Sequence, residues 1–173
     1  NLIRSHACGI GSSLSVSDTR AIMLVRLHTL AQGYSGINPT VLKTLATMLE
    51  HHITPIIPEH GSVGASGDLV QLAHIALSVI GEGTCVYKGE KIPTREAFVK
   101  TKLTPATLTG RDGLALINGT AAMTGIGAQN IRSAEHLLSL TLQNSALIFE
   151  LTGTYRESYS TTVGSVRNHT GQS

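Results

Sequence analysis

The chain has 173 residues, of which 41% are hydrophobic and 14% are charged, and its formal net charge is +2. This length suits one domain, and a composition rich in apolar residues and poor in charge excludes extensive disorder. The small net charge, without runs of Lys or Arg, argues against a nucleic acid or an anionic membrane surface as the main partner. No apolar stretch of about 18 residues occurs, so we expect no transmembrane helix.

Targeting and redox signals are sparse. No basic segment followed by an apolar leader is visible, and two cysteines, Cys8 and Cys85, do not make a disulfide framework, so we expect a reduced, cytoplasmic setting. Aromatic residues make up only 3%, although rings usually supply much of a core. We therefore expect a piece of a larger chain, or a chain that completes its core by association. No repeat or linker appears, which predicts a single region over residues 1–173 without an internal boundary.

The first predicted element is a helix over residues 19–32. Its apolar residues do not alternate as they would in a half-exposed strand, and its polar breaks are Arg26 and His28. Asp18 is expected to cap the start of this helix, and Gly33 is expected to end it, because glycine readily adopts the left-handed conformation found there.

Prolines set the next two elements. A second helix is predicted to begin at Asn38-Pro39, with Pro39 in its first turn. Pro55 and Pro58 disfavour a helix in the following segment, because proline lacks the backbone N–H and restricts the residue before it. Residues 53–59 are therefore expected to be extended.

A third helix is predicted over residues 68–80, with Asp68 as its cap. After the cap its polar residues are Gln71, His74 and Ser78, and the others are apolar. A helix that is apolar on most of its circumference belongs inside a packed bundle.

The remaining elements are one small β segment and two helices. Residues 84–93 are β-like with a turn at 88–90, Thr94 is expected to cap a brief helix, and the longest helix covers about residues 120–151. Small residues around Gly125 would let another helix approach closely. The sequence thus predicts a mainly α chain with one small β excursion.

Residues 58–69 carry the most chemical information. Glycines recur there at every third position before an apolar helix, as Gly61, Gly64 and Gly67. The segment could be an ordinary turn capped by Asp68, or an anion cradle, although Asp68 and Leu69 replace the lysine and hydroxyl that end a Walker loop. Ser66 could also be a nucleophile, although Asp68 occupies the place of the second glycine of a nucleophile elbow.

Several motifs of this sequence resemble those of one family, the aromatic amino-acid ammonia-lyases, which include histidine, tyrosine and phenylalanine lyases and related aminomutases. The motifs are NLIRSH at residues 1–6 with CGIG at 8–11, GYSG at 33–36, GSVGASGDLVQLAH at 61–74 and ALINGT at 115–120. Their order and separations also resemble the family across most of the chain. The resemblance implies a mainly α, helical-bundle portion of the ammonia-lyase fold, which is fumarase/aspartase-like.

The resemblance implies a prosthetic group made from the chain itself. Ala65, Ser66 and Gly67 would cyclise and dehydrate to 4-methylidene-imidazol-5-one (MIO), with no metal or nucleotide. The residue types suit this reaction: the Gly67 nitrogen must attack the Ala65 carbonyl, which is easiest without a Cβ, and Ser66 must lose its hydroxyl as water. The product would be an electrophile at a helix N-terminus, where the dipole withdraws electron density.

Three further residues receive roles through the resemblance. Asn118 would contact the electrophile and the amino-acid end of the substrate, although on its own an Asn before a glycine is usually a cap or a turn residue. His6, with Ser5 beside it, would bind the substrate ring; Ser-His at this place is typical of histidine lyases, whereas a lone His is more often packed or solvent-facing. Some bacterial tyrosine lyases share this form, so histidine is favoured and tyrosine remains an alternative.

The expected reaction is elimination of ammonia from an aromatic L-amino acid, giving trans-urocanate from histidine or coumarate from tyrosine. The resemblance implies a homotetramer with pockets shared between subunits. It also implies that a catalytic Tyr preceding this segment, and later pocket residues, are absent from it. The 173-residue chain alone is therefore predicted to be inactive.

Rival interpretations and departures from the family pattern complete the prediction. A phosphate-binding module would need basic residues around residues 61–67, where only His60 is available, and a catalytically silent assembly subunit would keep the helices but never form the ring. No metal site is expected, since adjacent histidines point apart and no ligand cluster completes them. Ala121 stands where the family usually has Gln, and Asn168 where it has Pro.

Overall fold

The structure of the protein, a computed structural model, describes residues 1–167, 169 and 171. It forms two compact units, Asn1–Asn130 and Ile131–Ser173, which are described separately below. The division falls inside the longest helix rather than in a linker, and the expectation of a single region without a boundary stays a prediction. Among the described residues, no helix combines the length and apolar character that crossing a membrane requires.

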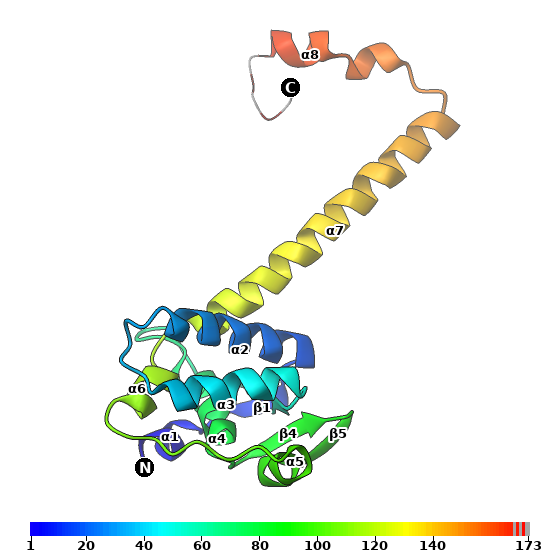
Figure 1. The fold of residues 1–173 in the computed structure, drawn as a ribbon. Coiled ribbons are helices and arrows are strands. Elements are labelled where there is room, and N and C mark those ends of the chain that lie inside the picture. Colours follow the sequence, from blue (N-terminus) through cyan, green and yellow to red (C-terminus); the bar gives the residue numbers. More distant parts are fainter. Residues whose placement is uncertain (168, 170, 172–173) are drawn as a thin grey trace. The chain divides into compact units, whose positions relative to one another are not determined.

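Helices dominate the first unit, as the sequence predicts (Figure 1). Its elements in chain order are α1 (Leu2–His6), β1 (Ile10–Ser13), α2 (Val16–Ala31), α3 (Pro39–Glu50), β2 (Thr54–Pro55), β3 (Pro58–His60), α4 (Leu69–Val79), β4 (Thr84–Tyr87), β5 (Glu90–Pro93), α5 (Thr94–Thr101), α6 (Asp112–Ile117) and the start of α7 (Ala121–Leu151).

Helix α2 begins three residues earlier than the sequence predicts. Its cap is Ser15, whose Oγ accepts a hydrogen bond of 3.0 Å from the Asp18 backbone N–H and donates one of 2.6 Å to the Asp18 carboxylate. Asp18 is therefore the third residue of the helix, where it bonds with the cap Ser15, and is not the cap itself. Gly33 follows the end of the helix with a φ of +84°, as expected for a glycine at this place.

Helix α3 confirms its prediction, since the Asn38 side chain accepts from the Thr40 N–H at 3.0 Å and Pro39 opens the first turn. Helices α2 and α3 pack side by side, and α4 lies against α1, α3 and α6 (Figure 1). The core joins the buried faces of these helices, and its largest fully buried side chains are Ile22, Met23, Leu30, Leu45, Met48, Ile53, Ile57, Leu72, Ile75, Phe98, Leu116 and Ile117.

Two small antiparallel sheets account for the β content. Strand β1 pairs with β3, and β2, β4 and β5 form a second sheet in the order β2-β4-β5. The β4–β5 hairpin turns at Lys88 and Gly89, both with positive φ, which is the primed turn that suits the twist of a hairpin. Thr94 is the first residue of α5 and Pro93 is its cap, so the predicted cap is displaced by one residue.

Helix α7 confirms the predicted longest helix, which runs from Ala121 to Leu151 and is followed by Gly153 in the left-handed region. A Cβ on Gly125 would lie 2.7 Å from the Ile22 nitrogen, so the absence of a side chain allows α2 to approach closely. The second unit contains the rest of α7, the 3-10 helix η1 (Arg156–Tyr159) and α8 (Thr161–Val166).

Candidate active site

The Ala65-Ser66-Gly67 tripeptide lies in the loop between β3 and α4. Gly64 and Gly67 have φ values of +70° and +94°, and each is paired within the loop as an isolated β-bridge, so the loop folds back on itself. A Cβ on Gly67 would lie 2.7 Å from the Gly119 carbonyl oxygen, which leaves no room for a side chain. Ala65 and Ser66 are both exposed.

The base of this loop is fixed by its neighbours in sequence and by β1. Pairing of β1 with β3 puts Ile10 opposite His60, so the segment that follows α1 runs beside the segment that leads into the loop. Ser62 accepts a hydrogen bond of 3.0 Å from the Val70 N–H, which satisfies a donor in the first turn of α4. Ser62 was not among the predicted site residues, although a hydroxyl shortly before a helix is a capping signal.

Asp68 occupies the N-cap position of α4, as expected, but its side chain is not used for capping. Its side chain makes no capping hydrogen bond to α4, and instead Oδ2 accepts from the Met123 N–H at 2.9 Å, in the first turn of α7. The Asp68 backbone N–H donates to the Gly119 oxygen at 2.7 Å. Asp68 thus joins the start of α4 to the start of α7, and this places the tripeptide against the turn at residues 118–120.

Asn118 is brought directly to the tripeptide. It ends α6 with extended dihedrals, φ −93° and ψ 107°, and its side-chain Nδ2 donates a hydrogen bond of 2.8 Å to the Ser66 carbonyl oxygen. Asn118 is therefore not an ordinary capping residue, because its side chain binds a residue 52 positions earlier in the sequence. Two of the predicted site residues, Ser66 and Asn118, are in contact.

Arg26 binds the backbone at the end of α6 and at Asn118, a contact that the sequence did not predict. This residue of α2 is only 4% exposed. Its Nε donates to the Leu116 oxygen at 3.0 Å, and Nη2 donates to the Asn118 oxygen at 2.7 Å and to the Ala115 oxygen. Burial lowers the pKa of the Arg26 guanidinium from its ordinary value. The one signal was a charged residue within an apolar helix.

His6 and Ser5 lie at the end of α1. The Ser5 hydroxyl donates to the Leu2 oxygen at 2.8 Å, and His6 Nδ1 lies 2.8 Å from the same oxygen, which requires a proton on Nδ1. A neutral His6 therefore presents Nε2 as an acceptor. Within the described part of the chain, the hydrogen bonds of His6 are made inside α1 and not to the tripeptide or Asn118.

A pocket of about 720 Å³ adjoins the Asn118 turn. It is lined by α2 and by the start of α7, through Leu24, Val25, Arg26, His28, Thr29, Ser35, Asn118, Gly119, Thr120, Ala121 and Thr124. Ala121, one of the two departures from the family pattern, is buried at its edge. The other departure, Asn168, lies outside the described residues.

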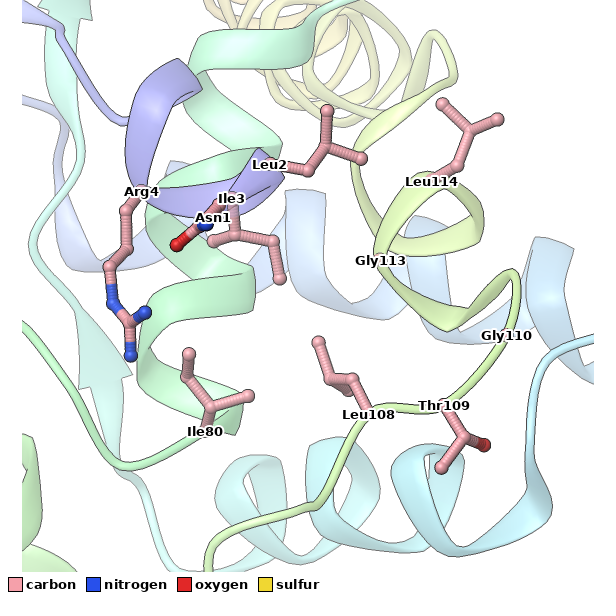
Figure 2. Close-up of a pocket in the computed structure, with 10 residues that line it drawn as sticks. All are labelled: Asn1, Leu2, Ile3, Arg4, Ile80, Leu108, Thr109, Gly110, Gly113 and Leu114. Carbon is pink, nitrogen blue, oxygen red and sulfur yellow. The ribbon is translucent and has the colours of Figure 1, made fainter.

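A second pocket, of about 460 Å³, lies between α1 and α6 (Figure 2). Its side chains are mostly apolar, and Leu2, Ile80 and Leu108 are among them. Arg4 also borders it, but its guanidinium is paired with Glu82, with an Nε–Oε2 distance of 2.9 Å, and this hydrogen bond lowers the pKa of the Glu82 carboxyl. The pocket contains no residue of the tripeptide loop and not Asn118, so we place the candidate site at Ser66 and Asn118.

Comparison with known proteins identifies the family. The aromatic amino acid lyase model matches residues 1–173. The chain is 49% identical over 150 residues to a histidine ammonia-lyase of Treponema denticola, covering 87% of this chain and 30% of that protein. It is 48% identical over 172 residues to a tyrosine 2,3-aminomutase of a Myxococcus species, covering 99% of this chain and 33% of that protein.

A solved structure agrees with the sequence comparison. Histidine ammonia-lyase from Trypanosoma cruzi superimposes with a TM-score of 0.93 at 30% identity, covering 99% of this chain and 34% of that one. The chain thus spans about a third of the length of the relatives it matches. The family expected from the motifs is confirmed: the chain belongs to the aromatic amino acid lyases.

Proposed function

We propose that the protein to which this chain contributes eliminates ammonia from an aromatic L-amino acid, with L-histidine as substrate and trans-urocanate as product. The observation that carries the proposal is the 2.8 Å hydrogen bond from the Asn118 side chain to the Ser66 carbonyl oxygen. It joins the two motifs that family membership makes relevant, and it does so at an exposed loop where a substrate could reach them.

The tripeptide fits the requirements of MIO formation. Gly67 sits where any Cβ would strike the Gly119 backbone, so only glycine can present its nitrogen there, and Ala65 and Ser66 add little bulk. Attack of the Gly67 nitrogen on the Ala65 carbonyl carbon closes the ring and releases one water. Loss of the Ser66 hydroxyl with its α-proton releases a second. The chain therefore loses two waters, about 36 Da, and needs no oxidant or metal.

The ring, when formed, supplies an electrophilic methylene that makes the substrate amine a better leaving group. The residues of this chain orient the groups around it. Asn118 holds the Ser66 carbonyl and has its amide oxygen available to a substrate donor. The N-terminus of α4 follows directly, and its dipole favours negative charge on the tripeptide. Removal of the weakly acidic β-proton requires a base, which we expect from outside this segment.

His6 is the proposed selector of the substrate ring. Because Nδ1 donates to the Leu2 oxygen, Nε2 of the neutral ring can accept from the N–H of a substrate imidazole. A phenol hydroxyl could donate to the same atom. Tyrosine, as substrate of a lyase or an aminomutase, is therefore the alternative, and a relative named tyrosine 2,3-aminomutase is nearly as similar as the histidine lyase.

The substrate experiment uses the full-length protein. It is incubated separately with histidine, tyrosine and phenylalanine, and the absorbance of urocanate, coumarate and cinnamate is followed. We expect urocanate to form with the highest kcat/KM. Coumarate as the main product would favour the tyrosine lyase, a β-amino acid would favour the aminomutase, and no reaction with any of the three would favour a silent assembly subunit and contradict the proposal.

We further propose that the enzyme is a cytoplasmic homotetramer whose pockets are completed by other segments and subunits. The 173-residue chain alone offers Ser5, His6, the tripeptide and Asn118, but no base. We therefore predict that the isolated chain produces no urocanate or coumarate. Measurable product from the purified 173-residue chain would contradict this prediction.

A further inference from the structure

Arg26 is a buried cation whose hydrogen bonds all go to backbone carbonyls. The three acceptors, Ala115, Leu116 and Asn118, belong to the last turn of α6 and its cap. Among the described residues, the ion pairs join Arg4 to Glu82 and Lys100 to Glu96, so no carboxylate neutralises Arg26. Burying a charge without a counter-ion costs free energy, and the partial negative charge at a helix C-terminus offsets only part of it.

Gly119 links Arg26 to the tripeptide, because it lies close to the Arg26 guanidinium and to Gly67. A Cβ on Gly119 would overlap the Arg26 guanidinium, and a Cβ on Gly67 would lie 2.7 Å from the Gly119 oxygen. The Gly119 peptide is therefore held between the guanidinium on one side and Gly67 on the other. The same turn carries Asn118, whose side chain donates to the Ser66 carbonyl at 2.8 Å.

We propose that Arg26 is a positioning residue, which acts on the reaction only through Asn118 by fixing the turn that carries it. The inference rests on the proposed function. A single carbonyl acceptor would be enough to satisfy one donor, but here Nε and Nη2 together bind three carbonyls, at Ala115, Leu116 and Asn118. Loss of Arg26 should leave the Asn118 amide present but displaced from Ser66.

The experiment compares two arginines of the same helix in the full-length enzyme. In Arg26→Met the hydrogen bonds to the carbonyls of Ala115, Leu116 and Asn118 are lost. In the matched control, Arg20→Met, the guanidinium that is lost donates at 3.1 Å to one carbonyl, Leu49, at the end of α3. Each change is also combined with Asn118→Ala, and kcat/KM is measured per ring-bearing subunit, with the ring content taken from intact mass.

We expect Arg26→Met to lower kcat/KM by about 10- to 100-fold, and Arg20→Met by less than about 3-fold. In the Asn118→Ala background, Arg26→Met should cost less than about 3-fold, because a residue that acts through Asn118 has nothing left to position. Arg26→Lys should fall between the wild type and Arg26→Met, since one ammonium cannot span the carbonyls that the planar guanidinium reaches.

Three results would overturn the inference while leaving the proposed function intact. The first is an equal fall in kcat/KM on changing Arg26→Met with and without the Asn118 side chain. The second is a fall in kcat/KM no larger than that of Arg20→Met. The third is a ring that is missing from Arg26→Met but present in Asn118→Ala. If Arg26→Met does not fold, the Lys variant is judged by the same criteria. A wild-type protein without ring or turnover would instead contradict the proposed function itself.

Discussion

At the scale of single residues, the site depends on a few backbone groups being held at fixed positions. The Asn118 amide donates to the Ser66 carbonyl. Gly67 approaches the Gly119 backbone too closely to carry a side chain, and a Cβ on Gly119 would overlap the Arg26 guanidinium. Ser62 and Asp68 use their oxygens to satisfy the N–H groups of Val70 and Met123. The loop is therefore arranged before any substrate binds, which is the condition for electrostatic stabilisation without reorganisation.

Asn118→Ala tests the role of the amide directly. Removing one preorganised donor or acceptor from a site typically costs about 10²- to 10³-fold in rate, and we expect a fall of this size in kcat/KM. The control is Asn38→Ala, which removes the cap of α3 and should lower the free energy of unfolding by about 1 kcal/mol without changing kcat/KM. Comparable kinetic losses in the two variants would contradict the assignment.

The sequence predicted some of these residues and not others, for a physical reason. The tripeptide and Asn118 stand in short contiguous motifs, so local sequence is enough to find them. Arg26 acts on carbonyls about 90 positions away, and nothing in its neighbourhood records those partners. Asp68 was placed correctly at the start of α4, but its actual partner lies in α7, which only the tertiary structure reveals.

At the scale of elements, the helices were predicted better than their ends. The predicted β hairpin and the helices that became α3, α4 and α7 are present, because their apolar spacing, prolines and glycines are strong local signals. The start of α2 was misplaced because Ser15 and Asp18 are both good capping residues and their competition is decided by geometry. Helix α6 was not foreseen, since six residues are too few to show a period.

Helix α4 predicts a pH dependence of stability. Burial lowers the pKa of His74 from its ordinary value of 6.5, and its Nε2 is buried without a hydrogen-bond partner in the described part of the chain. The unfolded chain then binds this proton more readily than the folded one. The contribution of neutral His74 is complete above pH 6.5 and is lost as the pH falls below that value towards the folded-state pKa, by at most about 1.4 kcal/mol per pH unit.

The measurement is the unfolding free energy of the full-length protein at pH 7.5 and 5.5, obtained from denaturant titrations. His74→Gln should lose less stability across this interval than the wild type does. His28→Gln, which changes an exposed histidine of α2, should keep the wild-type difference. An unchanged difference in His74→Gln would show that another group is responsible.

At the scale of the whole molecule, the second unit is dominated by an apolar helix surface. Exposed large hydrophobic residues of α7 in this unit are Ile131, Leu137, Leu138, Leu140, Leu142, Leu147, Ile148, Phe149 and Leu151. No charged residue occurs between His136 and Glu150. An exposed helix surface this rich in large apolar residues is typical of an interface with other helices, so we propose that this stretch forms the contact between copies in the proposed tetramer.

Leu138→Asp tests that assignment. A carboxylate in an apolar helix contact cannot be desolvated without a partner, so the full-length variant should dissociate into smaller species in light scattering. Val99→Asp is the control, since Val99 is 74% exposed on α5 of the first unit and should leave the mass of the assembly unchanged. An intact tetramer in Leu138→Asp would place the subunit contact elsewhere.

The central claim is that Ala65, Ser66 and Gly67 become a ring, and intact mass spectrometry of the full-length protein tests it most directly. We expect a mass about 36 Da below that of the translated sequence, a deficit that is absent in Ser66→Ala and retained in Ser158→Ala, which changes an exposed serine of η1. A correctly assembled wild-type protein that has the full mass of its linear sequence would contradict the claim.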